Sequence, residues 1–134
     1  MKLSSKTVTA IKLFVDLGEQ PQDAFISLKD VAERKGLSKK FLEQIVPIYK
    51  SNGLLQGKGG NQGGYKLTKA PVAISLKEII LPLENALHRE ATGYSPLDTY
   101  LTEVDNLLEG FFQDISLEAL IEKQRESYSY NYSI

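Results

Sequence analysis

Residues 27–46, SLKDVAERKGLSKKFLEQIV, carry the signals for two short helices joined by a tight turn. Ser27 and Ser38 each stand directly before a helical pattern, where a serine hydroxyl can accept a hydrogen bond from a free backbone N–H. Asp30 follows Ser27 at the spacing of a capping box. Gly36 permits a sharp reversal between the two helices. The stretch therefore predicts a helix-turn-helix, a motif whose second helix can enter the major groove of DNA.

The second of these helices has an apolar side and a polar side. Leu42, Ile45, Val46 and Tyr49 fall on one face and are predicted to be buried. On the opposite face, lysine can contact phosphate or guanine, glutamine can pair with adenine, and glutamate can accept from cytosine. We therefore expect DNA contacts from the cap and first turns of this helix: Ser38, Lys39, Lys40, Phe41, Glu43 and Gln44. An ordinary solvated helix face is the alternative.

A further helix and a β-hairpin are predicted on either side of this stretch. Residues 5–17 carry apolar side chains at helical spacing, and Gly18 is expected to end that helix. Two short strands, 54–55 and 65–67, flank a loop in which residues 57–64 hold half of the 10 glycines. A glycine-tipped hairpin beside a helix-turn-helix favours a winged helix. The remaining predicted DNA contacts are Lys6 and Ser27 from the helices and Lys58, Gly59, Gly60, Asn61 and Tyr65 from the hairpin.

The glycine-rich loop could also indicate a phosphate site in an enzyme, but its spacing argues against this. A Walker loop needs a glycine followed by Lys and then Ser or Thr, whereas Gly59 follows Lys58. The dinucleotide fingerprint fails because Gln62 stands where the third glycine would be, after Gly57 and Gly59. A plain flexible turn is the alternative to a DNA-contacting wing.

The second half predicts a connecting helix followed by a long helix with an apolar seam. Ser75 and Glu78 form another capping box, which opens a helix through about residue 86, and 87–94 is predicted to be a loop. Ser95 and Pro96 mark the start of the longest helix. Its apolar residues alternate at spacings of four and three, a heptad pattern that favours helix pairing. This predicted dimerisation seam is Leu97, Leu101, Val104, Leu108, Phe111 and Ile115.

These patterns predict a mainly α fold with a small β-hairpin wing, a winged helix-turn-helix plus a long C-terminal dimerisation helix. Residues 1–70 form the DNA-binding domain in this interpretation, 71–94 a connecting helix and loop, 95–126 the dimerisation helices, and 127–134 a C-terminal tail.

Charge follows the same division although the net charge of the 134 residues is only -1. Residues 1–70 contain 12 Lys or Arg and 6 Asp or Glu, whereas residues 71–134 contain 4 and 11. The excess of cations in the first half suggests that it faces a polyanion. The acidic residues of the second half flank the apolar seam and are interpreted as a solvated face.

Composition and motifs exclude several other classes of function. The chain has no cysteine, so it can form neither disulfides nor cysteine-ligated metal sites. His88 is the single histidine and has no second histidine or cysteine to complete a metal site, although a hard-cation site built from oxygen ligands stays open. No serine–histidine–acid or paired-carboxylate pattern stands out. We expect no enzyme activity, no cofactor, no membrane segment and a cytoplasmic location.

The chain resembles the IscR, NsrR and CymR family of bacterial winged-helix transcriptional regulators over nearly its whole length. The motifs that carry this resemblance are MKLSSK at 1–6, SLKDVAER at 27–34, LSKKFLEQI at 37–45, NGLL at 52–55 and GGYKL at 63–67. The resemblance implies a dimer in which long C-terminal helices pair and two recognition helices enter successive major grooves of a palindromic site.

This sequence departs from the family pattern at several positions. Many relatives hold an iron–sulfur cluster with cysteines in the segment that matches 87–106, and this chain has none. It therefore resembles the cluster-free branch, which includes regulators of cysteine metabolism controlled through a partner protein. Relatives also tend to carry arginine at the position of Gly59 and near Val8, where Lys58 and Lys6 would have to compensate.

The C-terminal tail resembles tails that dock into the active site of cysteine synthase. Tyr132, Ser133 and Ile134 would be the docking residues, with Ile134 last. A frayed aromatic tail is the alternative. Together these observations predict a homodimeric repressor at palindromic promoter sites, linked by resemblance to sulfur metabolism. The alternative from another class is a winged-helix adaptor that has lost specific DNA binding and contacts only proteins.

Overall fold

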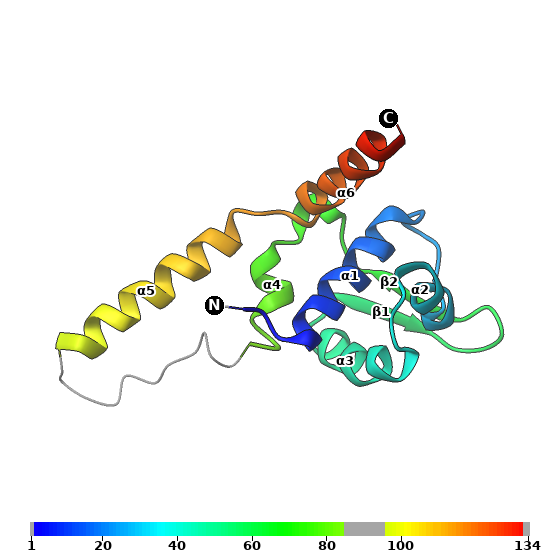
Figure 1. Ribbon diagram of the computed structural model, residues 1–134. Coiled ribbons are helices and arrows are strands. Elements are labelled where there is room, and N and C mark those ends of the chain that lie inside the picture. Colours follow the sequence, from blue (N-terminus) through cyan, green and yellow to red (C-terminus); the bar gives the residue numbers. More distant parts are fainter. Residues whose placement is uncertain (1, 85–95, 133–134) are drawn as a thin grey trace.

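The computed structural model describes residues 2–84 and 96–132 and confirms a mostly helical fold with one two-stranded hairpin. The elements follow in the order α1 (Ser5–Glu19), α2 (Leu28–Lys35), α3 (Lys39–Ser51), β1 (Leu55–Lys58), β2 (Gly64–Leu67), the 3-10 turn η1 (Pro71–Ala73), α4 (Leu76–Ile80), α5 (Pro96–Gln113) and α6 (Leu117–Tyr132). In Figure 1, α1, α2, α3 and the hairpin form one body, and α5 projects away from it.

The core of this body lies between α1 and α3. Leu13, Phe14, Leu42 and Tyr49 are fully buried there. The rings of Phe14 and Tyr49 meet edge to face with their centroids 4.8 Å apart. The Tyr49 hydroxyl donates to the Ile79 carbonyl at 2.6 Å, which satisfies its polar end inside the core and joins α3 to α4.

Local capping places the two helices of the predicted helix-turn-helix. Ser27 accepts from the Asp30 N–H at 3.1 Å, and Ser38 accepts from the Phe41 N–H at 3.2 Å. Gly36 adopts a left-handed φ of 64°, which lets α2 end and the chain reverse within a few residues. The fold of this segment is therefore fixed largely by its own sequence.

The hairpin pairs Leu55 with Leu67 and Lys58 with Gly64 in antiparallel register. The end of the strand pair nearest the glycine-rich loop is tied to the segment before α2, because Ile26 and Tyr65 exchange backbone hydrogen bonds of 2.9 and 2.8 Å. A Cβ at Gly64 would overlap the Ile26 backbone, so only glycine allows the two segments to approach this closely.

The last two helices, α5 and α6, pack against different parts of the body. Helix α6 packs on α1, where Leu117 and Ile121 join the main core. Helix α5 contributes Phe112 and Leu108 to a second cluster around Ile80, and Ile115 joins it from the connection that follows α5. Backbone bonds of 2.8 Å from Leu76 to Ile115 and from Leu117 to Ile74 hold the α5–α6 connection against α4.

Several boundaries differ from the sequence-based prediction. In the hairpin, the first strand is Leu55–Lys58 rather than 54–55. Gly18 does not end the first helix, because α1 continues to Glu19 and the missing Cβ at Gly18 makes room for Ile121 of α6. Helix α4 ends at Ile80 rather than near residue 86. Residues 127–132, predicted as a tail, continue α6 as helix.

Some predictions fall on residues outside the described ranges, namely the 87–94 loop, His88, Ser95, Ser133 and Ile134. Among the described residues, no helix is long and apolar enough to span a membrane.

Candidate nucleic-acid interface

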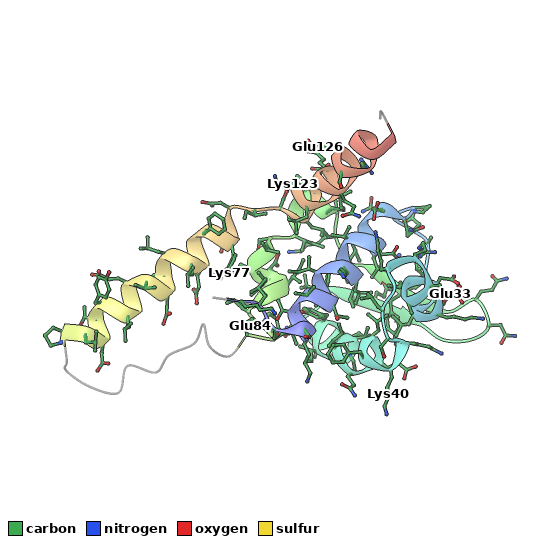
Figure 2. All side chains as sticks on the ribbon, viewed as in Figure 1. Glu33, Lys40, Lys77, Glu84, Lys123 and Glu126 are labelled. Carbon is green, nitrogen blue, oxygen red and sulfur yellow. The ribbon has the colours of Figure 1, made fainter. Side chains whose placement is uncertain are left out.

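The N-terminal turns of α3 present the predicted reading residues to solvent. Lys39, Lys40, Glu43 and Gln44 are exposed and Phe41 is half-buried, while Leu42 between them is buried. Figure 2 shows Lys40 pointing away from the body. Four of the six residues predicted on this helix and its cap are thus long polar side chains available for contact.

Glu43 modifies the charge of this surface. Its carboxylate lies 3.9 Å from the Lys39 ammonium, and both side chains are more than half exposed. An exposed pair of this kind is weak and can open when a phosphate or a base offers a better partner. Lys40 and Gln44 make no such contact within the described residues, so they can meet DNA without first breaking an ion pair.

The tip of the hairpin forms the second exposed part of the interface. Lys58, Gly59, Gly60 and Asn61 are all exposed. Gly60 has a φ of 93°, a backbone conformation that favours glycine, so the tip can turn sharply and keep its backbone accessible. A narrow loop with accessible amides and one lysine fits a minor groove or a phosphate backbone.

Two wing features were not predicted from the sequence. The ammonium groups of Lys58 and Lys66 lie 5.6 and 5.0 Å from the ring centroid of Phe25, so this aromatic ring holds two cations at the base of the wing. The Lys50 ammonium lies 6.0 Å from the Tyr65 ring. Strand alternation could have placed Lys58 and Lys66 on one face, but no sequence signal brings Phe25 to them.

Most of the other predicted contact residues also take part in holding the fold together. Ser27 and Ser38 use their hydroxyls as helix caps. Tyr65 is partly buried and its backbone is paired with Ile26. Lys6 is exposed in the first turn of α1.

The first turn of α1 is held by Glu84, a residue 77 positions after Thr7 in the chain. The Glu84 carboxylate accepts from the Thr7 hydroxyl at 2.7 Å and from the Ser4 N–H at 2.8 Å. The Thr7 hydroxyl bond, followed by the Ser4 backbone bond, lowers the pKa of Glu84 below its ordinary value. This contact fixes the turn that carries Lys6.

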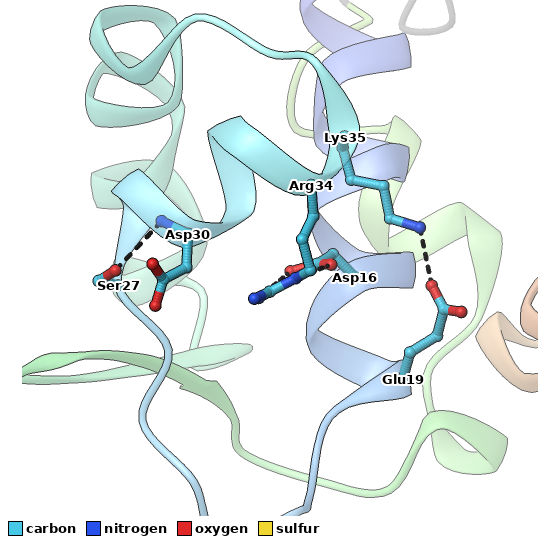
Figure 3. Close-up of polar contacts among 6 residues, drawn as sticks. All are labelled: Asp16, Glu19, Ser27, Asp30, Arg34 and Lys35. Carbon is cyan, nitrogen blue, oxygen red and sulfur yellow. Dashed lines mark hydrogen bonds and ion pairs between the residues drawn. The ribbon is translucent and has the colours of Figure 1, made fainter.

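An ion-pair clamp positions the helix-turn-helix on α1, as Figure 3 shows. The Arg34 Nε and Nη2 atoms each donate to Asp16 at 2.9 Å, and the Asp16 side chain is only 2% exposed. This hydrogen bond with Asp16 is the main cause that raises the pKa of Arg34. One turn away on α1, Glu19 accepts from Lys35 at 2.8 Å. Two ion pairs therefore set where α2, and with it the turn into α3, sits on the body.

The family model of Rrf2, described as an iron-dependent transcriptional regulator, matches residues 3–123. This chain belongs to the Rrf2 family. The HTH-type transcriptional regulator IscR of Photorhabdus laumondii is 31% identical to it over 135 residues, covering 92% of this chain and 81% of that protein.

Solved structures agree with the sequence comparison. The IscR structure of T. potens has a TM-score of 0.78 at 30% identity, covering 97% of this chain and 96% of that one. The structure of CymR (YrzC), the global cysteine regulator of B. subtilis, has a TM-score of 0.76 at 26% identity, covering 92% and 98%. The resemblance to IscR and CymR is confirmed, and this Rrf2 protein is a DNA-binding transcriptional regulator.

The iron dependence in the family description does not fit the residues of this member. The chain has no cysteine, so it cannot supply the thiolates that hold iron–sulfur clusters. Within residues 2–84 and 96–132, no three His, Asp or Glu side chains gather as a metal site would require.

The apolar side of α5 forms a second candidate surface. Leu97, Tyr100, Leu107 and Phe111 are between 61% and 74% exposed, and Val104 lies between them. Their spacings of three, four, three and four residues put them on one side of the helix; we call this set the α5 stripe. Of the predicted seam, Leu97, Val104 and Phe111 belong to the stripe, Leu101 is half-buried, and Leu108 and Ile115 pack on the protein's own second core cluster.

Proposed function

We propose that this Rrf2 protein is a homodimeric repressor that binds a palindromic promoter site without an iron–sulfur cluster. The observation that carries the proposal is the separation of two surfaces on one chain. The basic interface on α3 and the wing offers groups for DNA, and the α5 stripe offers an apolar face for a second copy.

The DNA contacts divide by chemistry. Gln44 and Glu43 are proposed to read base edges in the major groove, since an amide can pair with adenine and a carboxylate can accept from cytosine. Lys39, Lys40 and Lys6 are proposed to contact phosphates. Lys58, Gly59, Gly60 and Asn61 are proposed to follow the neighbouring minor groove.

The helix-capping serines and Tyr65 act indirectly in this proposal. Ser27 and Ser38 fix the starts of α2 and α3, and Tyr65 fixes the loop end of the strand pair through Ile26. A phosphate could still share the Ser27 or Ser38 hydroxyl, which retains a donor hydrogen while it accepts from the backbone.

A second copy of the chain is the proposed occupant of the α5 stripe. The stripe has heptad spacing, and that spacing favours pairing of two like helices. Four of its five side chains are at least 61% exposed and would otherwise remain in water. We propose that two-fold pairing of α5 brings two α3 helices to successive major grooves, the arrangement that half-sites of a palindrome require.

We further propose a link to cysteine or sulfur metabolism, with cysteine synthase as a partner. The support is the likeness to CymR, described as a global cysteine regulator. The proposed contact is the C-terminal segment that includes Tyr132, where α6 ends, with Ser133 and Ile134 beyond the described residues. Purified cysteine synthase should bind the full chain and lose affinity for a chain lacking 131–134; equal affinities would contradict this contact.

The deciding experiment combines the mass of the protein in solution with sequencing of the genomic fragments that it retains near physiological salt. We expect a dimer and an enriched palindrome whose half-sites are about one helical turn apart. Repression is then tested with a reporter driven by a retained promoter. A protein that binds no duplex in a salt-dependent way would instead be the adaptor considered above.

A further inference from the structure

A groove on the side of the body away from Lys40 is lined by cations over an apolar floor. It lies among α1, α2 and α6, has a volume of about 490 Å³, and contains no Asp or Glu among the described residues that line it. In Figure 2, Lys123 of α6 and Lys40 of α3 stand on opposite sides of the molecule. We call this the α1–α2–α6 groove.

The floor of the groove is apolar and firmly held. Ile11 and Val15 of α1 and Leu120 of α6 line it. Val15 is 9% exposed and belongs to the main core, and Ile11 and Leu120 pack against both core clusters. A ligand with a short apolar portion would therefore cover hydrophobic surface without disturbing the fold.

Four cations surround this floor: Lys12, Arg34, Lys35 and Lys123. Arg34 gives two of its N–H groups to Asp16, and Lys35 gives one to Glu19, so each keeps donors for another acceptor. Lys12 and Lys123 are exposed and make no hydrogen bond or ion pair within the described residues. As far as the described residues go, the groove thus has two unpaired positive charges and spare donors on two more.

We propose that the α1–α2–α6 groove binds a small organic anion, a carboxylate or phosphate ester with an apolar portion. Its volume lies within the range of roughly 300–1,000 Å³ that small-molecule sites occupy. The anionic group would lie between Lys12 and Lys123 and accept from the spare donors of Arg34. The apolar portion would rest on Ile11, Val15 and Leu120.

Such a ligand can affect α3, the proposed DNA-reading helix, through α2. Arg34 and Lys35 are the last-turn residues of α2, and their bonds to Asp16 and Glu19 set the position of α2 on α1 (Figure 3). An anion held by the remaining donors of Arg34 and Lys35 pulls on the same two side chains, and so shifts α2 and the adjoining turn into α3. This regulatory step rests on the proposed function, whereas binding in the groove does not.

Octanoate is a suitable probe because it joins a carboxylate to a short alkyl chain. The full chain, with labelled Ile, Leu and Val methyl groups, is titrated at constant ionic strength, and octanamide serves as the uncharged control. We expect saturable shifts at Ile11, Val15 and Leu120 with octanoate and not with octanamide. Shifts that are absent, or equal for the two compounds, would overturn the proposal.

Matched double variants test the cations. Lys12→Gln with Lys123→Gln should weaken octanoate binding by about fivefold or more, because it removes two charge contacts. Lys29→Gln with Arg125→Gln removes the same charge from α2 and α6 outside the groove lining and should leave binding unchanged. Equal weakening in both double variants would show that only the overall positive charge attracts octanoate. The proposed site would then be refuted.

The regulatory step is measured separately, as the affinity for a retained palindrome with and without saturating octanoate. We expect a change in the wild type that is lost in the Lys12→Gln, Lys123→Gln double variant. Octanoate binding with unchanged DNA affinity would reject the regulatory step and keep the site. Octanoate binding by a protein that retains no specific DNA would reject the proposed function alone.

Discussion

Helices α3 and α5 are both amphipathic, but the apolar face of α3 is buried and that of α5 is exposed. The apolar face of α3 is buried within the chain, where Leu42, Ile45, Val46 and Tyr49 are at most 1% exposed. The α5 stripe instead stands in water, with Leu107 74% exposed. Helix α3 therefore exposes a polar face to a binding partner, whereas α5 exposes an apolar face. This difference supports the proposal that α3 contacts DNA and that α5 contacts another protein surface.

The largest expected effect comes from placing a charge in the α5 stripe. Leu107→Glu should abolish the dimer, because the carboxylate would be buried against a second apolar stripe without a partner. Affinity for the palindrome should then fall on the order of 10²-fold or more, because a monomer binds with one DNA-binding domain instead of two linked ones. Measurement of mass in solution and of binding to whole and half palindromes checks this.

Asn106→Glu is the matched control for that change. Asn106 is exposed on the opposite side of α5, so the same charge there should leave the dimer intact. A Leu107→Glu protein that remained dimeric would break the contrast between α3 and α5, because the stripe would then have no role in pairing.

The next effect concerns base reading by α3. Gln44→Ala should cost about 1–3 kcal/mol of binding free energy on the cognate palindrome and little on random duplex, because it removes a base contact and leaves phosphate contacts in place. Competition binding with both DNAs gives the two free energies. Equal losses on the two DNAs would show that Gln44 contributes to binding independently of DNA sequence and does not contact a base.

The polar face of α3 also predicts an electrostatic effect that is independent of sequence. Lys40→Ala should weaken binding to all duplexes alike and reduce the slope of log affinity against log salt by about one. Arg125→Ala removes a cation from α6 and should leave the slope unchanged. The salt series is the measurement, and an unchanged slope for Lys40→Ala would show that this lysine does not neutralise a phosphate.

The same contrast explains which features could be predicted from the sequence. The helix-turn-helix was predictable because its signals are local: Ser27 and Ser38 cap the helices and Gly36 makes the turn. Gly18 misled because the reason for that glycine lies in α6, more than 100 residues later, where Ile121 needs the space. A short-range pattern cannot report a long-range contact.

The candidate interface shows the same division. The exposed side chains of α3 followed from helical periodicity, and the glycine-rich wing followed from composition. The Phe25 ring between Lys58 and Lys66 did not, because it depends on how the loop before α2 meets the hairpin. The clamp of Arg34 on Asp16 joins residues 18 positions apart on different helices, so no periodicity within either helix predicts it.

The smallest expected effect is a pH dependence that comes from Glu84. Its pKa is lowered in the folded protein chiefly by the Thr7 hydroxyl. A carboxyl whose folded pKa lies below its unfolded value stabilises the fold above the unfolded pKa, and that contribution is lost as pH falls through the folded pKa. Acidification should therefore lower the free energy of unfolding more in the wild type than in Glu84→Gln, which cannot titrate there.

Urea unfolding at neutral and acidic pH measures this difference, with Glu103→Gln, an exposed carboxylate on α5, as the control. Because Glu84 holds the first turn of α1, Glu84→Gln should also weaken DNA binding slightly through Lys6 and leave dimer formation unchanged. A Glu84→Gln protein with altered dimer formation would contradict the separation of the two surfaces, because this contact belongs to the DNA-binding body and not to the α5 stripe.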